Sequence, residues 1–572
     1  MTLGLKVLVL GDDTRSFLAV VRSLGRQRCA VHAAPFDFSS PALGSRYIGA
    51  VHRLPPYSLS PQAWVGSLRA LIESERFDLI IPCDDRSLIP LERHASELEG
   101  ARLAVPNREA MDVFFDKAET RALAAAHQVP VAPGRLLAPD DYASALASQY
   151  GLPLALKPRS SYVLGQAGAK SSVRIVRTEA ALAEALTRVP EPAEWLVEGY
   201  FDGQGVGLSV LAEHGELRLA FQHRRLAEAS ETGGSSSRIS EAVDPRFRAA
   251  VEALARASAL HGVAMFEFRE QGAGGPFILL EVNARFWGSL PLAVAAGADF
   301  PAALAAMLTG RPLPPERPYR TGLVQRDLGG EYYRVLVQSG ELPAPRRLLR
   351  LATGLGGIAL ALPTGRAFDS RAADDPAPWS AERGQFLAAF TRAIARRLPL
   401  LNGRRRRARR ALARMAEAVR QGRGSVVMLC HGNICRSPFA EKLLAAKAAA
   451  RGIDLQVISA GTIALEGRHS PPEAVAAARA YGADLAPHRS RYLDVEAART
   501  AAAVVVFDEK NVDELRRLGL YGQVNLLRLG DLAAAQEIAD PYGHGPAGFA
   551  QAYAEIDSAV ERLAAALPVR PR

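Results

Sequence analysis

The chain has 572 residues, of which 48% are hydrophobic and 23% charged, with a formal net charge of +10. This length and composition predict several globular domains. Its four cysteines argue against a disulfide framework, no apolar run reaches the roughly 18 residues of a membrane helix, and the first residues read as a strand rather than a signal peptide. We therefore expect a cytoplasmic, multidomain α/β protein.

Residues 1–105 alternate short apolar runs, such as 5–11 and 77–82, with segments of helical spacing. This alternation predicts a Rossmann-like parallel sheet. The first turn lacks the G-x-G-x-x-G pattern, so we predict no dinucleotide site there. Asp84 and Asp85 follow a strand-like run, at the edge where such sheets hold ligands. We interpret them as ordinary loop residues.

Residues 106–310 carry two lysines in positions suited to a nucleotide. Lys117 opens a helical segment, and Lys157 lies near the end of a strand-like run. A loop of small residues, 160–168, follows and is suited to cover phosphates. Each feature alone is also typical of an ordinary surface.

The stronger signal in this region is a set of polar side chains on two strand-like segments. Glu267 lies between two phenylalanines, and further along the chain Glu281, Asn283 and Arg285 alternate with other residues. The two-residue period of a strand puts the last three on one face. Two carboxylates and an amide oxygen suit Mg²⁺, and an arginine beside them can neutralise a phosphoryl group. A salt bridge between Glu281 and Arg285 is the structural alternative.

This constellation resembles the ATP-grasp superfamily, specifically its carbamoyl-phosphate synthase type, over residues 1–310. The resemblance implies a Rossmann-like domain at 1–105 followed by an α+β ATP-grasp domain at 106–310. ATP would be held by Lys117, Lys157, Glu198 and Arg285, and Mg²⁺ by Glu267, Glu281 and Asn283. It also implies that an unknown carboxylate is activated as an acyl phosphate and joined to an unknown amine. Segment 233–237 matches a family segment near the acceptor less specifically.

Residues 311–423 begin proline-rich and continue with helical spacing and many arginines. We interpret them as a helical extension and a linker without visible chemistry. Residues 404–410 hold six arginines, which we read as a solvated helix or linker, with contact to an acidic membrane surface left open. No aromatic residue interleaves with them, so we expect no nucleic-acid partner.

The most specific motif begins at 426, where an apolar run ends at Cys430 and a short loop leads into a helix opened by Ser437 and Pro438. Between a strand end and a helix N-terminus, backbone N–H groups converge on an anion. Arg436 can hold two phosphate oxygens with its planar fork. We expect Cys430 to exist there as the thiolate, the form that attacks. A buried structural thiol is the alternative, but the Gly, Asn, Ser and Pro residues of the loop favour catalysis.

Position for position, this loop resembles the signature loop of low-molecular-weight protein tyrosine phosphatases, and the resemblance covers residues 424–568. It implies a parallel-sheet α/β domain that cleaves phosphotyrosine or a small aryl phosphate through a cysteinyl-phosphate, without a cofactor. The implied catalytic residues are Cys430, Arg436 and Asp540, the last as general acid and then base. The implied supports of the loop are Asn433, Ser437 and His488.

The sequence thus predicts a bifunctional phosphatase and ATP-dependent ligase, with alternatives open. The ATP-grasp half is alternatively a nucleotide-binding module that regulates the phosphatase, or both halves act on one small molecule. Arsenate reduction is disfavoured, because reductases that share this loop use two further cysteines and none follows Cys435 here. A reversible disulfide between Cys430 and Cys435 is a further hypothesis. Peroxide-treated protein that carries only sulfinic acid at Cys430 would count against it.

Overall fold

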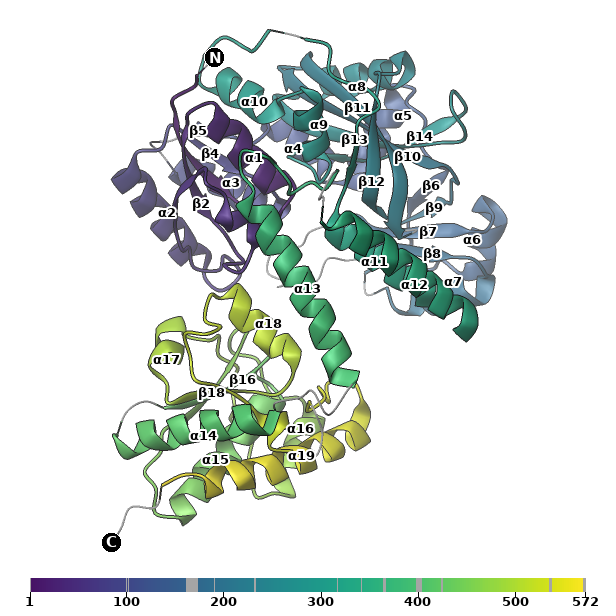
Figure 1. Ribbon diagram of the computed structural model, residues 1–572. Coiled ribbons are helices and arrows are strands. Elements are labelled where there is room, and N and C mark those ends of the chain that lie inside the picture. Colours follow the sequence, from purple (N-terminus) through teal and green to yellow (C-terminus); the bar gives the residue numbers. More distant parts are fainter. Residues whose placement is uncertain are drawn as a thin grey trace. The chain divides into compact units, whose positions relative to one another are not determined.

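The computed structural model (Figure 1) forms two compact units, one mainly from residues 1–384 and the other mainly from residues 385–572. The structure describes the whole chain except residues 1, 99, 101, 161–172, 190, 231, 232, 316, 341, 364–366, 398–403, 423, 424, 534–536 and 569–572.

The first unit opens with the predicted Rossmann-like sheet, whose five strands are parallel and run in the order β3-β2-β1-β4-β5. Strand β1 is fully buried from its second residue onward, which is typical of a parallel sheet covered on both faces. The strands are β1 (Lys6–Leu10), β2 (Ala30–Ala34), β3 (Ile48–Val51), β4 (Leu79–Pro82) and β5 (Arg102–Leu103). The helices are α1 (Ser16–Arg26), α2 (Pro61–Glu75) and α3 (Asp85–Arg93).

A small antiparallel sheet follows, with the order β6-β9-β7-β8. Its strands are β6 (Gly134–Leu136), β7 (Leu154–Pro158), β8 (Arg174–Val176) and β9 (Trp195–Gly199). Helices α4 (Arg108–Phe114) and α5 (Lys117–Ala126) precede this sheet, and α6 (Ala143–Tyr150) and α7 (Glu179–Thr187) pack on it.

A larger antiparallel sheet has six strands in the order β14-β13-β10-β11-β12-β15. They are β10 (Gln204–Glu213), β11 (Glu216–Ser230), β12 (Gly233–Glu241), β13 (Gly262–Glu270), β14 (Phe277–Asn283) and β15 (Val324–Arg326). Alternate residues of β10 and β13, such as Leu208 and Phe266, pack against α8 (Pro245–Ala257). The residues between them therefore face the opposite side, where the first unit holds a cavity.

Two short apolar helices, α9 (Leu290–Ala296) and α10 (Phe300–Leu308), pack with α1 in one core. Among the described helices, none alone is long and apolar enough to cross a membrane; α9 and α10 reach that composition only as a pair bent by 90°. Three longer helices occupy the region expected to be helical, namely α11 (Leu328–Gly340), α12 (Ala344–Ala361) and α13 (Ala377–Arg397).

The second unit contains a parallel four-stranded sheet with the order β17-β16-β18-β19. The strands are β16 (Val426–Cys430), β17 (Val457–Gly461), β18 (Ala503–Val506) and β19 (Leu526–Arg528). One core holds side chains of α14 (Arg404–Arg420), α15 (Arg436–Ala450), α16 (Pro472–Arg479) and α19 (Gly545–Ala565). The other core holds those of α17 (Val495–Thr500) and α18 (Glu509–Arg517).

Helix α14 differs from the linker expected at this position. Its buried residues Ala408, Ala411 and Met415 share the core of α15 and α19, and Asn525 donates from Nδ2 to the Ala411 carbonyl at 3.1 Å. The folded unit therefore begins before the predicted boundary at residue 424. The arginines at 406, 407, 409 and 410 are exposed on the helix, and their contact with an acidic membrane stays a prediction.

Candidate functional site

The Cys430 sulfur lies where β16 ends, among polar groups that can stabilise a thiolate. Its Sγ is 3.0 Å from Oγ of Ser437 and accepts the backbone N–H of Asn433 at 3.3 Å. The residue is only 3% exposed, yet it stands at the carboxyl end of a parallel sheet, directly before the N-terminus of α15. The strand and the helix thus present this sulfur beside a group of amides suited to an anion.

Asn433 fixes the shape of the loop through both its backbone and its side chain. Its φ of +51° is the left-handed conformation that asparagine tolerates better than most residues. Its Nδ2 donates to Ser437 Oγ at 2.9 Å, and its Oδ1 accepts the Arg491 N–H at 2.8 Å. One buried amide therefore connects the turn, the hydroxyl beside the sulfur and a neighbouring segment.

His488 braces the same turn from outside the loop. Its Nε2 donates to the Asn433 carbonyl at 2.7 Å, so the proton is on Nε2. The side chain is buried, and burial lowers the pKa of His488, so the imidazole is neutral at physiological pH. The residue expected to brace the loop thus does so as a neutral hydrogen-bond donor.

Arg436 is held by three acceptors although its side chain is only 2% exposed. Nη1 donates to Asp508 Oδ2 at 2.6 Å and to the Ile538 carbonyl at 3.0 Å, and Nη2 donates to Asp540 Oδ2 at 2.7 Å. Burial opposes the charge of this guanidinium, but Cys430 and the two carboxylates outweigh it and raise the pKa of Arg436. The group is therefore permanently cationic.

The structure brings together the expected catalytic residues Cys430, Arg436 and Asp540, the last with a half-exposed carboxylate. Two neighbours were missed. Asp508 lies two residues after the end of β18 and caps α18, a position at the carboxyl edge of the sheet that could have been recognised. Arg468 donates to the Gly432 carbonyl at 2.6 Å from a loop that no sequence pattern marks.

Cys435, the second thiol of the loop, is buried and has a different environment. Burial, followed by the charges of Asp540 and Cys430, raises the pKa of Cys435, so this thiol stays protonated. Its carbonyl accepts the hydroxyl of Tyr553 at 3.1 Å. Cys435 is therefore not the nucleophile, and its disulfide with Cys430 stays a hypothesis.

The first unit contains a cavity of about 610 Å³. All of the residues assigned to ATP and Mg²⁺ by resemblance line it, namely Lys117, Lys157, Glu198, Glu267, Glu281, Asn283 and Arg285. They come from α5, β7, β9, β13, β14 and the turn after β14. The small-residue loop after Ser160 lies outside the described residues, whereas Ser236 and Ser237 of the segment at 233–237 are buried on β12.

Glu267 and Glu281 are register partners on the neighbouring strands β13 and β14. The Asn283 amide lies 3.5 Å from Glu267 and 3.3 Å from Glu281, so three oxygen-bearing side chains converge. Burial raises the pKa of Glu267, whereas Lys117 and the Asn283 amide outweigh burial and lower the pKa of Glu281. This set of hard oxygen ligands fits Mg²⁺.

Arg285 does not pair with Glu281, so the alternative interpretation of this segment as a salt bridge is wrong. Its guanidinium donates to Asp85 at 2.6 and 3.0 Å and to Oδ1 of Asn283 at 3.0 Å. The interpretation of Asp85 as an ordinary loop residue is also wrong, because it lines the cavity and orients Arg285. Asp84 instead caps α3.

Glu198 is buried on β9 and bridges two cations. It forms an ion pair with Lys157 and accepts a hydrogen bond from Arg121 at 2.6 Å. Arg121 lies on α5, one turn after Lys117, and was missed because helical spacing alone does not distinguish it from a surface arginine.

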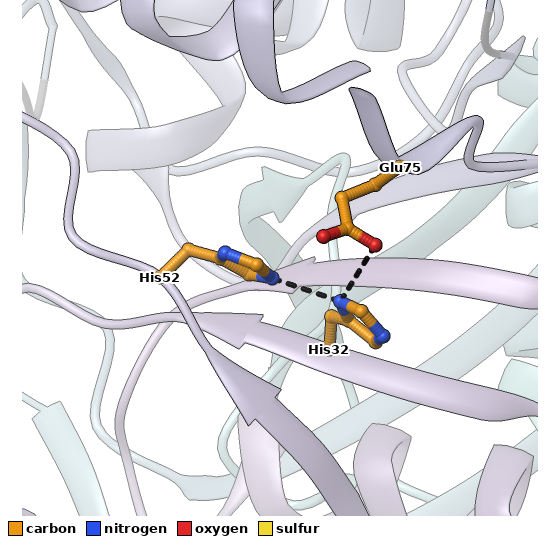
Figure 2. A group of neighbouring side chains, drawn as sticks. All are labelled: His32, His52 and Glu75. Atoms are coloured by element: carbon orange, nitrogen blue, oxygen red, sulfur yellow. Dashed lines mark hydrogen bonds and ion pairs between the residues drawn. The ribbon is translucent and has the colours of Figure 1, made fainter. Parts of the chain in front are cut away.

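A separate cluster of possible metal ligands, His32, His52 and Glu75, lies in the Rossmann-like part (Figure 2). His32 Nδ1 is 2.8 Å from His52 Nε2 and 3.9 Å from the Glu75 carboxylate. The same Glu75 oxygen accepts Lys6 Nζ at 2.5 Å. The imidazoles therefore hydrogen-bond to each other and Lys6 neutralises the carboxylate, so the cluster is satisfied without an ion and we assign it no metal.

Two family models match the chain. The model described as low molecular weight phosphotyrosine protein phosphatase matches residues 425–570. The model described as ATP-grasp in the biosynthetic pathway with Ter operon matches residues 191–327.

Curated relatives match the second unit. The probable low molecular weight protein-tyrosine-phosphatase AmsI of Erwinia amylovora is 30% identical over 143 residues, which is 25% of this chain and 96% of that protein. The probable phosphatase EpsP of Ralstonia nicotianae is 32% identical over 137 residues, or 24% of this chain and 91% of that protein. Wzb of Escherichia coli is 28% identical over 143 residues, which is 25% of this chain and 95% of that protein.

Solved structures are similar to about half of the chain, at low identity. N5-carboxyaminoimidazole synthetase from Staphylococcus aureus is 14% identical with a TM-score of 0.45, covering 57% of this chain and 83% of that chain. An L-amino acid ligase from Bacillus licheniformis is 18% identical with a TM-score of 0.39, covering 53% of this chain and 74% of that chain.

Proposed function

The chain belongs, through residues 425–570, to the low molecular weight phosphotyrosine protein phosphatase family, and we propose that this part hydrolyses phosphotyrosine or a small aryl phosphate. The observation that carries the proposal is the grouping of a sulfur, a buried guanidinium and a half-exposed carboxylate, Cys430, Arg436 and Asp540, around one loop.

The proposed reaction has two steps. The Cys430 thiolate attacks phosphorus, an S–P bond forms and the P–O bond to the aryl group breaks, while Asp540 gives its proton to the departing oxygen. Water then attacks the cysteinyl-phosphate, Asp540 takes a proton from that water, and the S–P bond breaks to release phosphate. Arg436 and the loop amides stabilise the charge on the phosphoryl oxygens in both steps.

The preference of the chain for phosphotyrosine over phosphoserine tests this proposal. We expect the wild-type chain to dephosphorylate a phosphotyrosine peptide much faster than the same peptide with phosphoserine, because an aryl oxide is the better leaving group. Comparable rates on both peptides, or no rate on either, would contradict the assignment.

We propose in addition that the cavity of the first unit binds Mg·ATP and activates a carboxylate. Lys117 and Lys157 would hold the phosphates, with Glu198 toward the nucleoside. Mg²⁺, held by Glu267, Glu281 and Asn283, would offset the charge of the β- and γ-phosphates. Arg285, which Asp85 orients, would face the transferring phosphoryl group. The support is that all of these side chains line one cavity and that the donor set suits the ion.

ATP turnover distinguishes a ligase from a nucleotide-binding regulatory module. Glu281→Gln keeps the shape of the side chain and removes one charge, so a ligase should lose ATP turnover while the structure persists. If the wild-type chain binds Mg·ATP but never turns it over with any acid and amine, the regulatory alternative is favoured.

The four cysteines are free thiols, which fits the cytoplasmic location expected from the sequence.

A further inference from the structure

One row of residues crosses the six-stranded sheet beneath the cavity. Glu281 on β14 is the register partner of Glu267 on β13. Glu267 in turn lies opposite Gly207 on β10, and Gly207 lies opposite His223 on β11. The row therefore runs from the carboxylates proposed to hold Mg²⁺, over a glycine, to an imidazole. Both carboxylates and the imidazole line the cavity.

The two glycines of β10 make room for side chains of β11. A Cβ at Gly207 would lie 2.2 Å from Cε1 of His223, and a Cβ at Gly205 would lie 2.6 Å from Cδ of Arg225. Any larger residue on β10 would displace the imidazole and the guanidinium. The glycines thus allow both side chains to extend over β10, where Arg225 donates to Glu267 at 2.5 Å.

His223 is a buried, neutral and unsatisfied group in the cavity wall. Burial, reinforced by the charges of Arg225 and Arg238, lowers the pKa of His223 to about 3. Its side chain makes no hydrogen bond to any described residue, and Nδ1 is fully buried. A buried polar group without a partner costs free energy, so a hydrogen-bonding ligand is the natural complement of this ring.

Most cations of the cavity wall already have acidic partners. The ion pairs are Lys157–Glu198, Arg225–Glu267, Arg238–Asp369, Arg269–Glu228 and Arg285–Asp85. The acidic partners neutralise the charge of these five cations, so none of the five needs an anionic ligand.

Arg15 differs from these cations. Its guanidinium lies against Gly288, where a Cβ would be 3.1 Å from Nη1. It is attracted by Asp327, Asp13 and Asp369, but it makes no hydrogen bond or ion pair with any of them, nor with any other residue that the structure describes. A permanently charged group in a cavity wall without a direct partner is suited to an anionic ligand.

We propose that Arg15 and His223 form the acid-binding end of this cavity, and that the acid is a small monocarboxylate with an uncharged hydroxyl or amide group. The inference rests on the proposed ATP-dependent activation. Arg15 pairs with the carboxylate, and His223 hydrogen-bonds to the uncharged group. A carboxylate oxygen attacks the γ-phosphorus, the bond to the β-phosphate oxygen breaks, and ADP leaves with that electron pair. Among the other cavity-wall cations that the structure describes, each has a partner, so none of them is left for a second carboxylate.

Positional isotope exchange in ¹⁸O-labelled ATP tests this without knowing the amine, because it reports reversible acyl-phosphate formation. The full-length chain is incubated with Mg·ATP and glycolate, lactate, N-acetylglycine, acetate, malonate or succinate. Binding of a non-hydrolysable ATP analogue is measured separately by calorimetry. The variants are Arg15→Met, Arg15→Lys and His223→Phe, with Arg69→Met on the exposed face of α2 as the matched control.

We expect exchange with the hydroxylated or amidated monocarboxylates, and weaker exchange with acetate and the dicarboxylates. Arg15→Met should raise the KM for the acid by about tenfold or more and leave nucleotide affinity within about twofold, with Arg15→Lys between. His223→Phe should remove the preference for lactate or glycolate over acetate.

Three outcomes would overturn the inference: an unchanged KM in Arg15→Met, a preference for dicarboxylates, or no exchange with any of these acids in a chain that binds the nucleotide. A chain that does not bind the nucleotide refutes the proposed ATP site itself, and this inference with it.

Discussion

Asp540 Oδ2 accepts a hydrogen bond from Nη2 of Arg436 at 2.7 Å, so the proposed general acid occupies part of the fork that is to bind phosphate. The other arm, Nη1, is held by Asp508 and by a backbone carbonyl. We infer that an incoming phosphate replaces only the Asp540 contact. Once released, the Asp540 carboxylate, which is half-exposed and carried by a loop, takes up a proton from solvent and can give it to the leaving oxygen.

Removing the Asp540 carboxylate should therefore strengthen oxyanion binding while it slows catalysis. For Asp540→Ala we expect about fivefold tighter binding of tungstate by calorimetry, from the loss of about 1 kcal/mol of competing attraction at a solvent-accessible ion pair. Asp454→Ala, at an exposed position of the same unit, is the control and should bind tungstate as the wild type does. Weaker binding in Asp540→Ala would contradict this reading of the Arg436 contact.

Asn433→Ala should destabilise the loop for two separable reasons. Alanine loses both side-chain hydrogen bonds and is strained at a φ of +51°, so we expect the free energy of unfolding of this unit to fall by about 2–4 kcal/mol. Asn433→Gly removes the amide but accepts the backbone conformation, so its loss should be smaller. Hydrogen exchange of the β16 amides measures the loss of unfolding free energy in each of the two variants. Equal losses would mean that the left-handed conformation contributes nothing.

Stability of the second unit should depend on pH through His488. Burial lowers the pKa of His488 in the folded state, whereas in the unfolded chain it is near 6.5. Below that pH the unfolded state binds more protons, so the free energy of unfolding falls as the pH decreases from 6.5. His488→Gln should flatten this dependence in hydrogen exchange of β16, whereas the exposed control His469→Gln should keep it. Identical slopes in the wild type and His488→Gln would exclude this role.

Metal removal should separate the two halves. Because the phosphatase chemistry uses only a sulfur, a guanidinium and a carboxylate, excess EDTA should leave aryl phosphate hydrolysis unchanged. The same treatment should abolish isotope exchange in ATP, because Glu267 and Glu281 would then face the phosphates without a cation between them. Parallel loss of both activities would contradict a metal-free phosphatase.

The parts that could be predicted from sequence are those whose determinants are local. The loop from Cys430 to Ser437 contains its nucleophile, its guanidinium and its turn residue in one segment, and strand periodicity is enough to place Glu281 and Asn283 on one face. The extent of the second unit was not predictable in the same way. The buried face of α14 consists mostly of alanines among arginines, so its composition suggested a solvated linker.

The missed residues owe their roles to tertiary placement. Asp508 and Asp85 each follow a strand at the carboxyl edge of a different sheet, and only the folded chain shows which arginine each one meets. Gly205 and Gly207 are likewise ordinary strand glycines in the sequence. Their structural role becomes visible only in the folded chain, where His223 and Arg225 occupy the space that side chains at these two positions would need.

The most direct test of the account is hydrolysis of p-nitrophenyl phosphate, with EDTA present, by the wild type, Cys430→Ser and Asp540→Asn. We predict that the wild type is active, that Cys430→Ser has no activity above background, and that Asp540→Asn loses about 10²–10⁴-fold in kcat. Full activity in Cys430→Ser, or an inactive wild type, would contradict the thiolate mechanism and leave the loop as an anion-binding element.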